Sequence, residues 1–393
     1  MNIKNTMRLN YYIFFCIIFL LPIFSEAQTC PSIKDAIGNE NVTIGCGYPL
    51  SSNGCATLKV DFPAINYTGT YNDAQKITYA PLGNLNQGTP IGIYEDDKFI
   101  KKIDFSTLGN IPFTFSFYGK IYDSVLVSSN GFITFDNNLN EGDFSTADIV
   151  GQTIPSTYLP KSSVFGVFQD LNFKGQNGAE IYYRVEGKAP CRKLIINFYK
   201  GVITGTNQVV SSQIVLHEFT NIVDVFVENK PIADASAKVK EALIGITDEF
   251  GNGISPTNRN TGIWAANKEG YRFTPSGNSI NPSRIIWSGS STQALPTCLN
   301  LNHCETPICS TKDETILATA YYNLPDGSIL KYSDDIDITF EADFPKAKDF
   351  IKIICDGSST TYLQSDINPD LTIHGTAISS FVFKYYTNYA DAL

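Results

Sequence analysis

Histidine is scarce in this chain, and the local patterns that usually mark catalytic residues are missing. The sequence holds three histidines, and it contains neither a Gly-x-Ser-x-Gly elbow nor a His-Glu-x-x-His pair. His217 and Asp224 are residue types of a catalytic triad, but no nucleophile motif accompanies them. We therefore expect no catalytic residue and no enzymatic activity.

Positive charge is also low. Lysine and arginine number 29 against 39 acidic residues, which leaves a formal net charge of −10. Because phosphate binding depends on clustered cations, this balance argues against nucleic acid and anionic membrane surfaces as partners. Long apolar runs are missing after residue 24, so we expect no direct membrane span in the mature chain.

The N-terminal residues have the order of an export signal. Lys4 and Arg8 precede the apolar run Tyr11–Phe24, and Ser25-Glu26-Ala27 follows it. A charged start, a short apolar run and small residues at the exit are typical of a secretory signal peptide. The run has 14 residues, whereas a membrane-spanning helix needs about 20. The sequence predicts cleavage after Ala27 and a secreted protein.

Cysteine is present in a number that suits an oxidising compartment. Cys16 leaves with the signal peptide, and an even set remains: Cys30, Cys46, Cys55, Cys191, Cys298, Cys304, Cys309 and Cys355. An even set in an exported chain predicts disulfides, although spacing does not determine their pairing. Our hypothesis is a local Cys46–Cys55 loop and a bond from one of the three cysteines at 298–309 to Cys355. The alternative, a zinc site at His303, Cys304 and Cys309, lacks a second ligand pair.

Strand-forming residues dominate the mature chain. Tyr, Phe, Ile, Val and Thr are abundant, with Ser, Asn and Gly to form turns. Phe113–Tyr118 alternates large apolar with small polar residues, and Asn130-Gly131 separates the apolar segments Ser124–Val127 and Phe132–Phe135. Since Asn-Gly favours a tight hairpin, these segments predict a β-meander. Similar segments recur to residue 287, whereas the helix-permissive stretch Ile232–Leu243 is short.

These patterns predict an all-β protein, with an antiparallel β-sandwich followed by a smaller Ig-like β-sandwich unit. The expected organisation is a signal peptide (1–27), a Cys-rich lead-in (28–60), the large sandwich (61–288), a Cys-rich linker (289–312) and the second unit (313–393). The last unit stops soon after a strand, without a closing element. We expect the chain to be the front part of a longer protein.

One loop has the composition of a weak calcium site. Oxygen-bearing side chains occur at alternate positions after a strand, at Asp136, Asn138 and Asn140, and Asp143 follows three residues later. Glu141 stands where an EF-hand loop requires glycine, so a solvated loop is the alternative. Asp170 and Asn172 belong to a similar loop. Asp170, Asp248 and Glu249 are not spaced as the paired carboxylates of a glycosidase, and no other cofactor is expected.

A series of motifs resembles one known family. It comprises Phe113–Phe135, Phe165–Asp170, Pro190-Cys191-Arg192, Ser211–Glu218 with Asn221–Val225, and Arg259–Gly262 leading to Tyr271–Pro275. The ordered series resembles nidogen-like extracellular modules, in particular the N-terminal module of large surface proteins of gliding diderm bacteria. It covers roughly residues 40–287.

The resemblance implies surface adhesion, gliding motility, a continuation into Ig-like repeats and a type IX secretion sorting domain. It implies no catalytic residues. Two features depart from the family. No sorting domain occurs up to residue 393, and Ser116 stands where the family often has a cysteine, which leaves Cys191 to find another partner.

We therefore expect a non-catalytic adhesion or interaction module on a bacterial cell surface. Its partner would be an extracellular surface, a glycan or a protein ligand, bound by exposed loops. A secreted glycan-active enzyme and a passive structural spacer are the alternatives. A convergent carboxylate pair in a deep cleft would favour the enzyme, and a surface without unusual loops would favour the spacer.

Overall fold

The expected all-β class is confirmed. The computed structural model describes residues 30–44, 55–92, 95–174, 178–289, 295–310 and 312–340. Within these ranges there are many strands, mostly antiparallel, the short 3₁₀ helix η1 (Phe105–Thr107), and no α-helix. Ile232–Leu243 is a loop before β18. The predicted signal peptide, Cys46, Cys355 and the strands expected after residue 340 lie outside the described residues.

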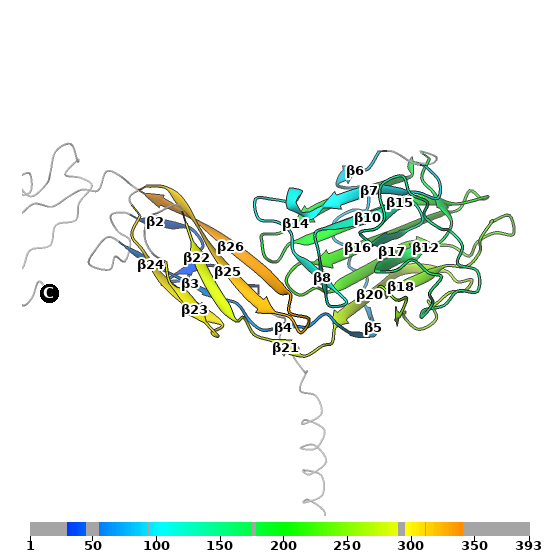
Figure 1. The fold of residues 1–393 in the computed structure, drawn as a ribbon. Coiled ribbons are helices and arrows are strands. Elements are labelled where there is room, and N and C mark those ends of the chain that lie inside the picture. Colours follow the sequence, from blue (N-terminus) through cyan, green and yellow to red (C-terminus); the bar gives the residue numbers. More distant parts are fainter. Residues whose placement is uncertain are drawn as a thin grey trace, which may run out of the picture. The chain divides into compact units, whose positions relative to one another are not determined.

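The described residues from Pro31 onward belong to one compact unit, which contains a large and a small sandwich (Figure 1). The first sheet of the large sandwich has the order β19 (Gly253–Ile254), β18 (Leu243–Thr247), β12 (Ser163–Phe168), β11 (Phe132–Thr134), β10 (Ser124–Ser128), β7 (Phe99–Asp104). The second has the order β5 (Tyr71–Ile77), β20 (Ala266–Pro275), β17 (Val223–Lys230), β16 (Val209–His217), β15 (Lys193–Ile203), β14 (Glu180–Glu186), β6 (Thr89–Pro90), with β13 (Leu171–Asn172) beside β15.

A single apolar core joins these two sheets. β12 contacts β16 and β17 across the sandwich. The facing side chains, such as Val164 and Val167 of one sheet and Ile214 and Val225 of the other, are fully buried. Alternation along each strand sends every second side chain inward, which is the period that the sequence shows. The core is therefore built by the pattern that predicted the strands.

The predicted Asn-Gly hairpin is confirmed, because β10 and β11 pair antiparallel on either side of Ser129–Gly131. The aromatic segment that precedes it does not join the meander. Its strand β8 (Phe115–Phe117) pairs only with β9 (Lys120–Tyr122) among the described strands, while β7 takes the place beside β10. The physical reason is burial on both faces, since Phe115, Ser116 and Phe117 are all inaccessible.

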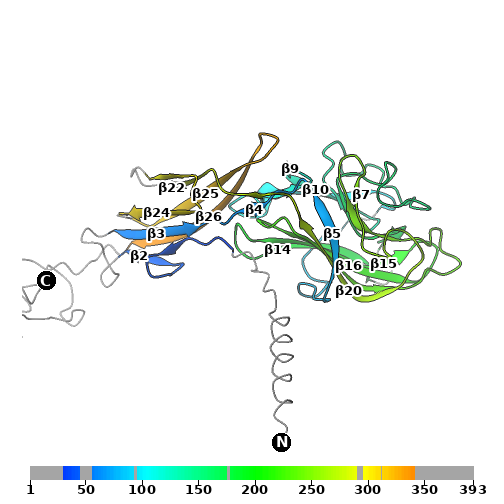
Figure 2. The same cartoon turned by 90° about the horizontal axis from the view of Figure 1, so that it is seen from below.

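The small sandwich also has two sheets (Figure 2). One has the order β2 (Val42–Ile44), β26 (Ile329–Phe340), β25 (Glu314–Asn323), β22 (Arg284–Ser288), β23 (Thr297–Leu299), and the other β1 (Lys34–Asp35), β3 (Ala56–Asp61), β24 (His303–Ile308). The strands β4 (Ile65–Asn66) and β21 (Ser279–Ile280) form a separate two-stranded antiparallel sheet.

Segments that are distant in sequence build this small sandwich. Residues expected to close the large sandwich form β22, which pairs with β25 instead. The expected lead-in supplies β2 and most of β3, and the expected linker supplies β23 and β24. Apolar side chains from both sheets, including Leu58, Trp287 and Ile316, share one core. A strand that forms a core with distant partners cannot be assigned to a domain from its place in the sequence.

Candidate functional site

Three loops at one end of the first sheet carry exposed apolar side chains. Tyr158 is 81% exposed and Phe250 is 65% exposed, and Val150 and Ile263 are each 54% exposed. They lie on loop 149–160, on the turn between β18 and β19, and on the segment before β20. We call these four side chains the apolar loop surface.

Hydrogen bonds hold these loops together. Ser156 donates its backbone N–H to the carbonyl oxygen of Gly251 at 2.9 Å. Asn260 accepts from the backbone N–H of Ile154 at 2.7 Å and donates to the carbonyl of Ile154, also at 2.7 Å. The hydroxyl of Thr261 donates to the carbonyl of Gln152. These hydrogen bonds connect the three loops to one another.

The buried side of loop 149–160 explains why its outer side chains project. Ile149, Ile154 and Leu159 pack on the outer face of the first sheet, in a cluster that includes Phe132, Phe165 and Phe168. Most of the residues between these three are exposed. The loop therefore uses one set of apolar residues for anchoring and leaves Val150 and Tyr158 without that role.

Polar groups border the apolar loop surface. The carboxylate of Asp248 accepts from the backbone N–H groups of Phe250 and Asn252, each at 2.8 Å, and from the Asn252 amide at 3.1 Å. Lys120 and Glu249 form an exposed ion pair of 2.5 Å beside them. Hydrogen-bonding groups and aromatic rings are both available at this end of the sandwich.

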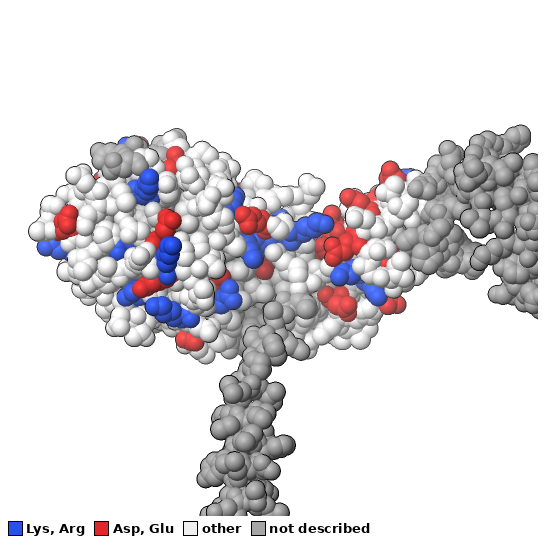
Figure 3. All heavy atoms as spheres, turned by 180° about the vertical axis from the view of Figure 1, so that it is seen from behind, with Lys and Arg blue, Asp and Glu red and all other residues white. Residues whose placement is uncertain are grey.

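One cleft of the protein has a mainly acidic lining. A cleft of about 460 Å³ is lined by Glu40, Asp334, Asp335 and Asp337, together with Lys188 and Arg192. Burial raises the pKa of Asp334 to about 6. On the face shown in Figure 3, acidic side chains gather over the small sandwich, and those of both signs are interspersed on the large one. No continuous basic surface is visible on that face, consistent with the low positive charge of the sequence.

The predicted calcium loop has its side chains engaged locally. Asp136 accepts from the backbone and side-chain nitrogens of Asn138, and Asp143 accepts from the backbone N–H of Asn140. These are turn contacts that the chain makes without an ion. The carboxylates that converge, among the described residues, are those of Asp96, Asp97 and Asp170.

Sequence reasoning noticed Asp170 and missed its two partners. Asp96 and Asp97 lie before β7 and follow no recognisable ligand spacing. The adjacent pair of acidic residues next to a strand was the only local signal, and it is common on surfaces. Their approach to Asp170 depends on the pairing of β7 with β10, which is tertiary.

Both disulfide hypotheses are wrong. Cys55 is bonded to Cys309, across 254 positions of sequence, and Cys298 is bonded to Cys304. The register of β3 with β24 sets Ala56 opposite Ile308 and so brings Cys55 beside Cys309. All three cysteines at 298–309 are therefore occupied, which leaves none for Cys355 or for zinc. Cys30 and Cys191 are disulfide-bonded as well.

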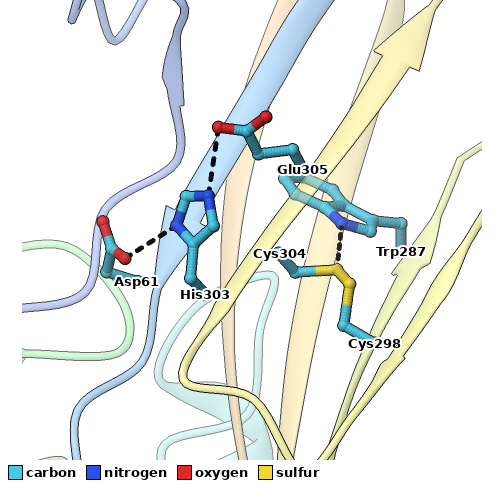
Figure 4. Close-up of a disulfide and its surroundings, with 6 residues drawn as sticks. All are labelled: Asp61, Trp287, Cys298, His303, Cys304 and Glu305. Atoms are coloured by element: carbon cyan, nitrogen blue, oxygen red, sulfur yellow. Dashed lines mark hydrogen bonds and ion pairs between the residues drawn. A yellow bond between two sulfur atoms is a disulfide. The ribbon is translucent and has the colours of Figure 1, made fainter.

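The Cys298–Cys304 disulfide lies against Trp287, whose indole N–H points to Cys304 Sγ at 3.1 Å (Figure 4). His303 is turned the other way, between Asp61 at 2.8 Å and Glu305 at 3.0 Å. The hydrogen bond to Asp61 raises the pKa of His303. This histidine is a surface ion-pair partner in the described structure.

His217 and Asp224 do meet, as a triad would require. His217 Nε2 lies 2.8 Å from Asp224 Oδ2. The third member is Arg272, which binds both carboxylate oxygens of Asp224 at 2.7 Å. Burial opposes ionisation of Asp224, but the hydrogen bonds from Arg272 and His217 lower its pKa overall. His217, Asp224 and Arg272 form an ion-pair network on the outer face of the second sheet.

Comparison with known proteins gives one match. A family model described as "NIDO related" matches residues 67–275. No curated protein and no solved structure matches the chain. Within the described residues, no helix has the length and apolar character needed to cross a membrane. The matched range covers all strands of the two sheets of the large sandwich and includes the loops that carry Tyr158 and Phe250.

Proposed function

The chain belongs to the NIDO-related family, and from this we propose that it is a non-catalytic interaction module exposed on a bacterial cell surface. A nidogen-like domain and disulfides both point to an extracellular protein. The ordered motifs that resemble surface proteins of gliding bacteria support the finer assignment to a large adhesin carried by type IX secretion. A role in gliding motility follows from the same resemblance.

The observation that carries the proposal is the apolar loop surface. Tyr158, 81% exposed, and Phe250, 65% exposed, lie on loops joined by the Ser156–Gly251 hydrogen bond. A cluster of exposed apolar side chains on a rigid scaffold is a candidate interaction site, because burying them against a partner releases free energy. Binding through loops on a sandwich also suits this fold class.

The partner that fits this chemistry best is a carbohydrate polymer. The C–H groups on one face of a pyranose ring pack on the electron-rich face of an aromatic ring. Sugar hydroxyls at the ring edge pair with amides and carboxylates, such as those of Asn252 and Asp248 beside Phe250. A strongly cationic partner would require clustered acidic side chains and a phosphorylated partner clustered basic ones, and the four side chains of the apolar loop surface are uncharged.

Retention on insoluble polysaccharides and on whole cells tests the proposal. Tyr158→Ser combined with Phe250→Ser should weaken retention about tenfold, the size expected for the loss of anchoring aromatic residues. The matched control is Leu299→Ser with Leu301→Ser, which removes two side chains that are 63% and 55% exposed on the small sandwich. The control should bind as the unmodified chain does.

Three outcomes would overturn the proposal in whole or in part. Equal loss in both double variants would show that apolar exposure in general, and not this surface, drives retention. Binding to cells that survives removal of surface glycans but not protease treatment would identify a protein partner instead. Hydrolysis of the polysaccharide would contradict the non-catalytic assignment. Antibody labelling of intact cells separately tests the surface location.

A further inference from the structure

Three carboxylates from two distant segments meet beside the Asn-Gly hairpin. Asp96 and Asp97 precede β7, and Asp170 lies between β12 and β13. One oxygen of each lies within 4.8 Å of the others. Asp170 is 1% exposed, while Asp96 and Asp97 are half-buried. Three like charges this close repel each other strongly unless a cation lies among them.

Asn130 holds this cluster in place. Its side chain is fully buried and donates to Asp97 Oδ1 at 3.1 Å, while its Oδ1 accepts from the backbone N–H of Leu171, next to Asp170, at 3.1 Å. Asn172 donates to Asp96 Oδ2 at 3.1 Å. Two neutral amides thus orient the carboxylates without neutralising them.

The turn itself is constrained by Gly131. Its φ of +79° lies in the left-handed region, and an added Cβ would overlap the carbonyl oxygen of Val167. The hairpin is therefore pressed against β12 close to the point where the chain continues into Asp170. The positions of Asn130 and Asp170 are coupled by the backbone.

Two carboxylate oxygens of the cluster remain buried without a hydrogen bond. They are Asp170 Oδ2 and Asp96 Oδ1. Lys238 lies next to the cluster, and its Nζ is 3.7 Å from Asp170 Oδ2. The Lys238 side chain is 65% exposed. One solvated ammonium at this distance does not satisfy three carboxylates. A buried oxygen anion without a hydrogen-bond donor is costly, so its presence indicates a missing partner.

We propose that Asp96, Asp97 and Asp170 form a binding site for a calcium ion. Two oxygens bound to one Ca²⁺ at about 2.4 Å can be at most about 4.8 Å apart, which is the limit that these atoms meet. The ligands are all oxygen, as a hard cation requires, and no sulfur or imidazole lies in the group. The half-buried side, at Asp96 and Asp97, leaves room for water to complete the shell.

Calcium fits better than magnesium or zinc. Mg²⁺ requires near-octahedral geometry at about 2.1 Å and keeps most of its water, whereas Ca²⁺ accepts six to eight ligands in an irregular shell. Zn²⁺ prefers nitrogen and sulfur ligands. On binding, the ion takes the place of Lys238 beside Asp170. This site is separate from the loop at Asp136–Asp143 and does not depend on the carbohydrate proposal.

Calorimetric titration of the EDTA-treated full chain with Ca²⁺ tests the site, with thermal unfolding as a second measurement. Extracellular calcium modules bind with dissociation constants of about 10⁻⁴ to 10⁻³ M, and we expect the unmodified chain to fall in or below this range. Asp170→Asn should weaken Ca²⁺ binding more than about tenfold. Asp136→Asn is the matched control, since it removes one carboxylate from the other loop, and it should bind Ca²⁺ normally.

Thermal unfolding distinguishes loss of the site from loss of the fold. In EDTA, Asp170→Asn should melt no lower than the unmodified chain, because it relieves repulsion. At a free Ca²⁺ concentration about tenfold above the dissociation constant, only chains with an intact site should show a higher melting temperature. Absence of any Ca²⁺ binding by the unmodified chain would overturn the proposal. Loss of binding in Asp136→Asn but not in Asp170→Asn would move the site to the other loop.

Discussion

The side-chain amide of Asn221 and the phenol of Tyr332 exchange hydrogen bonds. Asn221 Nδ2 donates to the phenol oxygen at 2.8 Å, and the phenol donates back to Oδ1 at 3.1 Å. Asn221 lies in the turn between β16 and β17, with a φ of 52°, and Tyr332 lies on β26. Both side chains are buried. Asn221 Oδ1 also accepts from the backbone N–H of Ser116 at 2.8 Å, so one side chain links the aromatic strand β8 to the small sandwich.

Replacement of Asn221 should lower the free energy of unfolding substantially. Asn221→Ala leaves the Ser116 N–H and the Tyr332 hydroxyl buried without partners and keeps a positive φ that alanine disfavours, so we expect a loss of about 3 kcal/mol in the free energy of unfolding. Tyr332→Phe removes only the phenol oxygen and should cost about 1.5 kcal/mol. Urea denaturation measures both. Equal costs for the two variants would contradict the central role of Asn221.

The Cys55–Cys309 and Cys298–Cys304 disulfides should differ in their contribution to stability. Cys55–Cys309 spans 254 positions and Cys298–Cys304 spans 6. Because a cross-link restricts the unfolded chain more when its loop is longer, Cys55→Ser with Cys309→Ser should cost about 5 kcal/mol and Cys298→Ser with Cys304→Ser about 2 kcal/mol. Denaturant titration of the two double variants gives the comparison. The reverse order would show that native packing around Trp287 outweighs chain entropy.

Acid should stabilise the protein through Asp334. Burial raises the pKa of this carboxyl to about 6, above its value of about 3.9 in an unfolded chain. Between these values the folded state holds the proton more tightly, so this group makes stability fall as the pH rises from 4 to 6 and contributes up to about 3 kcal/mol of difference. Asp334→Asn should remove this contribution while its side-chain oxygen still accepts from the Ile33 N–H.

Chemical denaturation at pH 4.5 and pH 7.5 checks the sign. The unmodified chain should lose more stability over that interval than Asp334→Asn does. The difference between the two chains isolates Asp334 from other titrating groups, such as Asp170, whose pKa burial also raises. Parallel pH profiles for the two chains would contradict the assignment.

Two glycines with similar φ should respond differently to alanine. Gly131 (φ +79°) faces the carbonyl of Val167, whereas Gly142 (φ +86°) has open space around it. Gly142→Ala should cost about 1 kcal/mol from its backbone conformation alone. Gly131→Ala adds a backbone overlap and should cost about 3 kcal/mol. Thermal or urea unfolding of the two variants tests whether the hairpin is pressed against β12 as described.

Local patterns were sufficient for much of the fold. The apolar segments on either side of Asn130-Gly131 predicted the strands that became β10 and β11, because strand-forming composition and turn residues are local signals. The Asn130-Gly131 turn was predicted because both residues accept a positive φ. The even number of cysteines in the mature chain predicted disulfides. The export signal stays a prediction, because it lies outside the described residues.

Pairing and convergence required the tertiary structure. β8 does not join the meander because tertiary packing buries both of its faces, and Asn221, more than a hundred positions away, accepts a hydrogen bond from the backbone of Ser116. Cys55 is bonded to Cys309 rather than to Cys46 because β3 pairs with β24. The candidate metal ligands converge at Asp170 rather than in the loop at Asp136 because the hairpin and β7 bring Asp96 and Asp97 to it. The amino-acid sequence determined which segments form strands and which residues can turn, since both depend on near neighbours. Only the long-range register decided which side chains meet, since that depends on the free energy of the whole core.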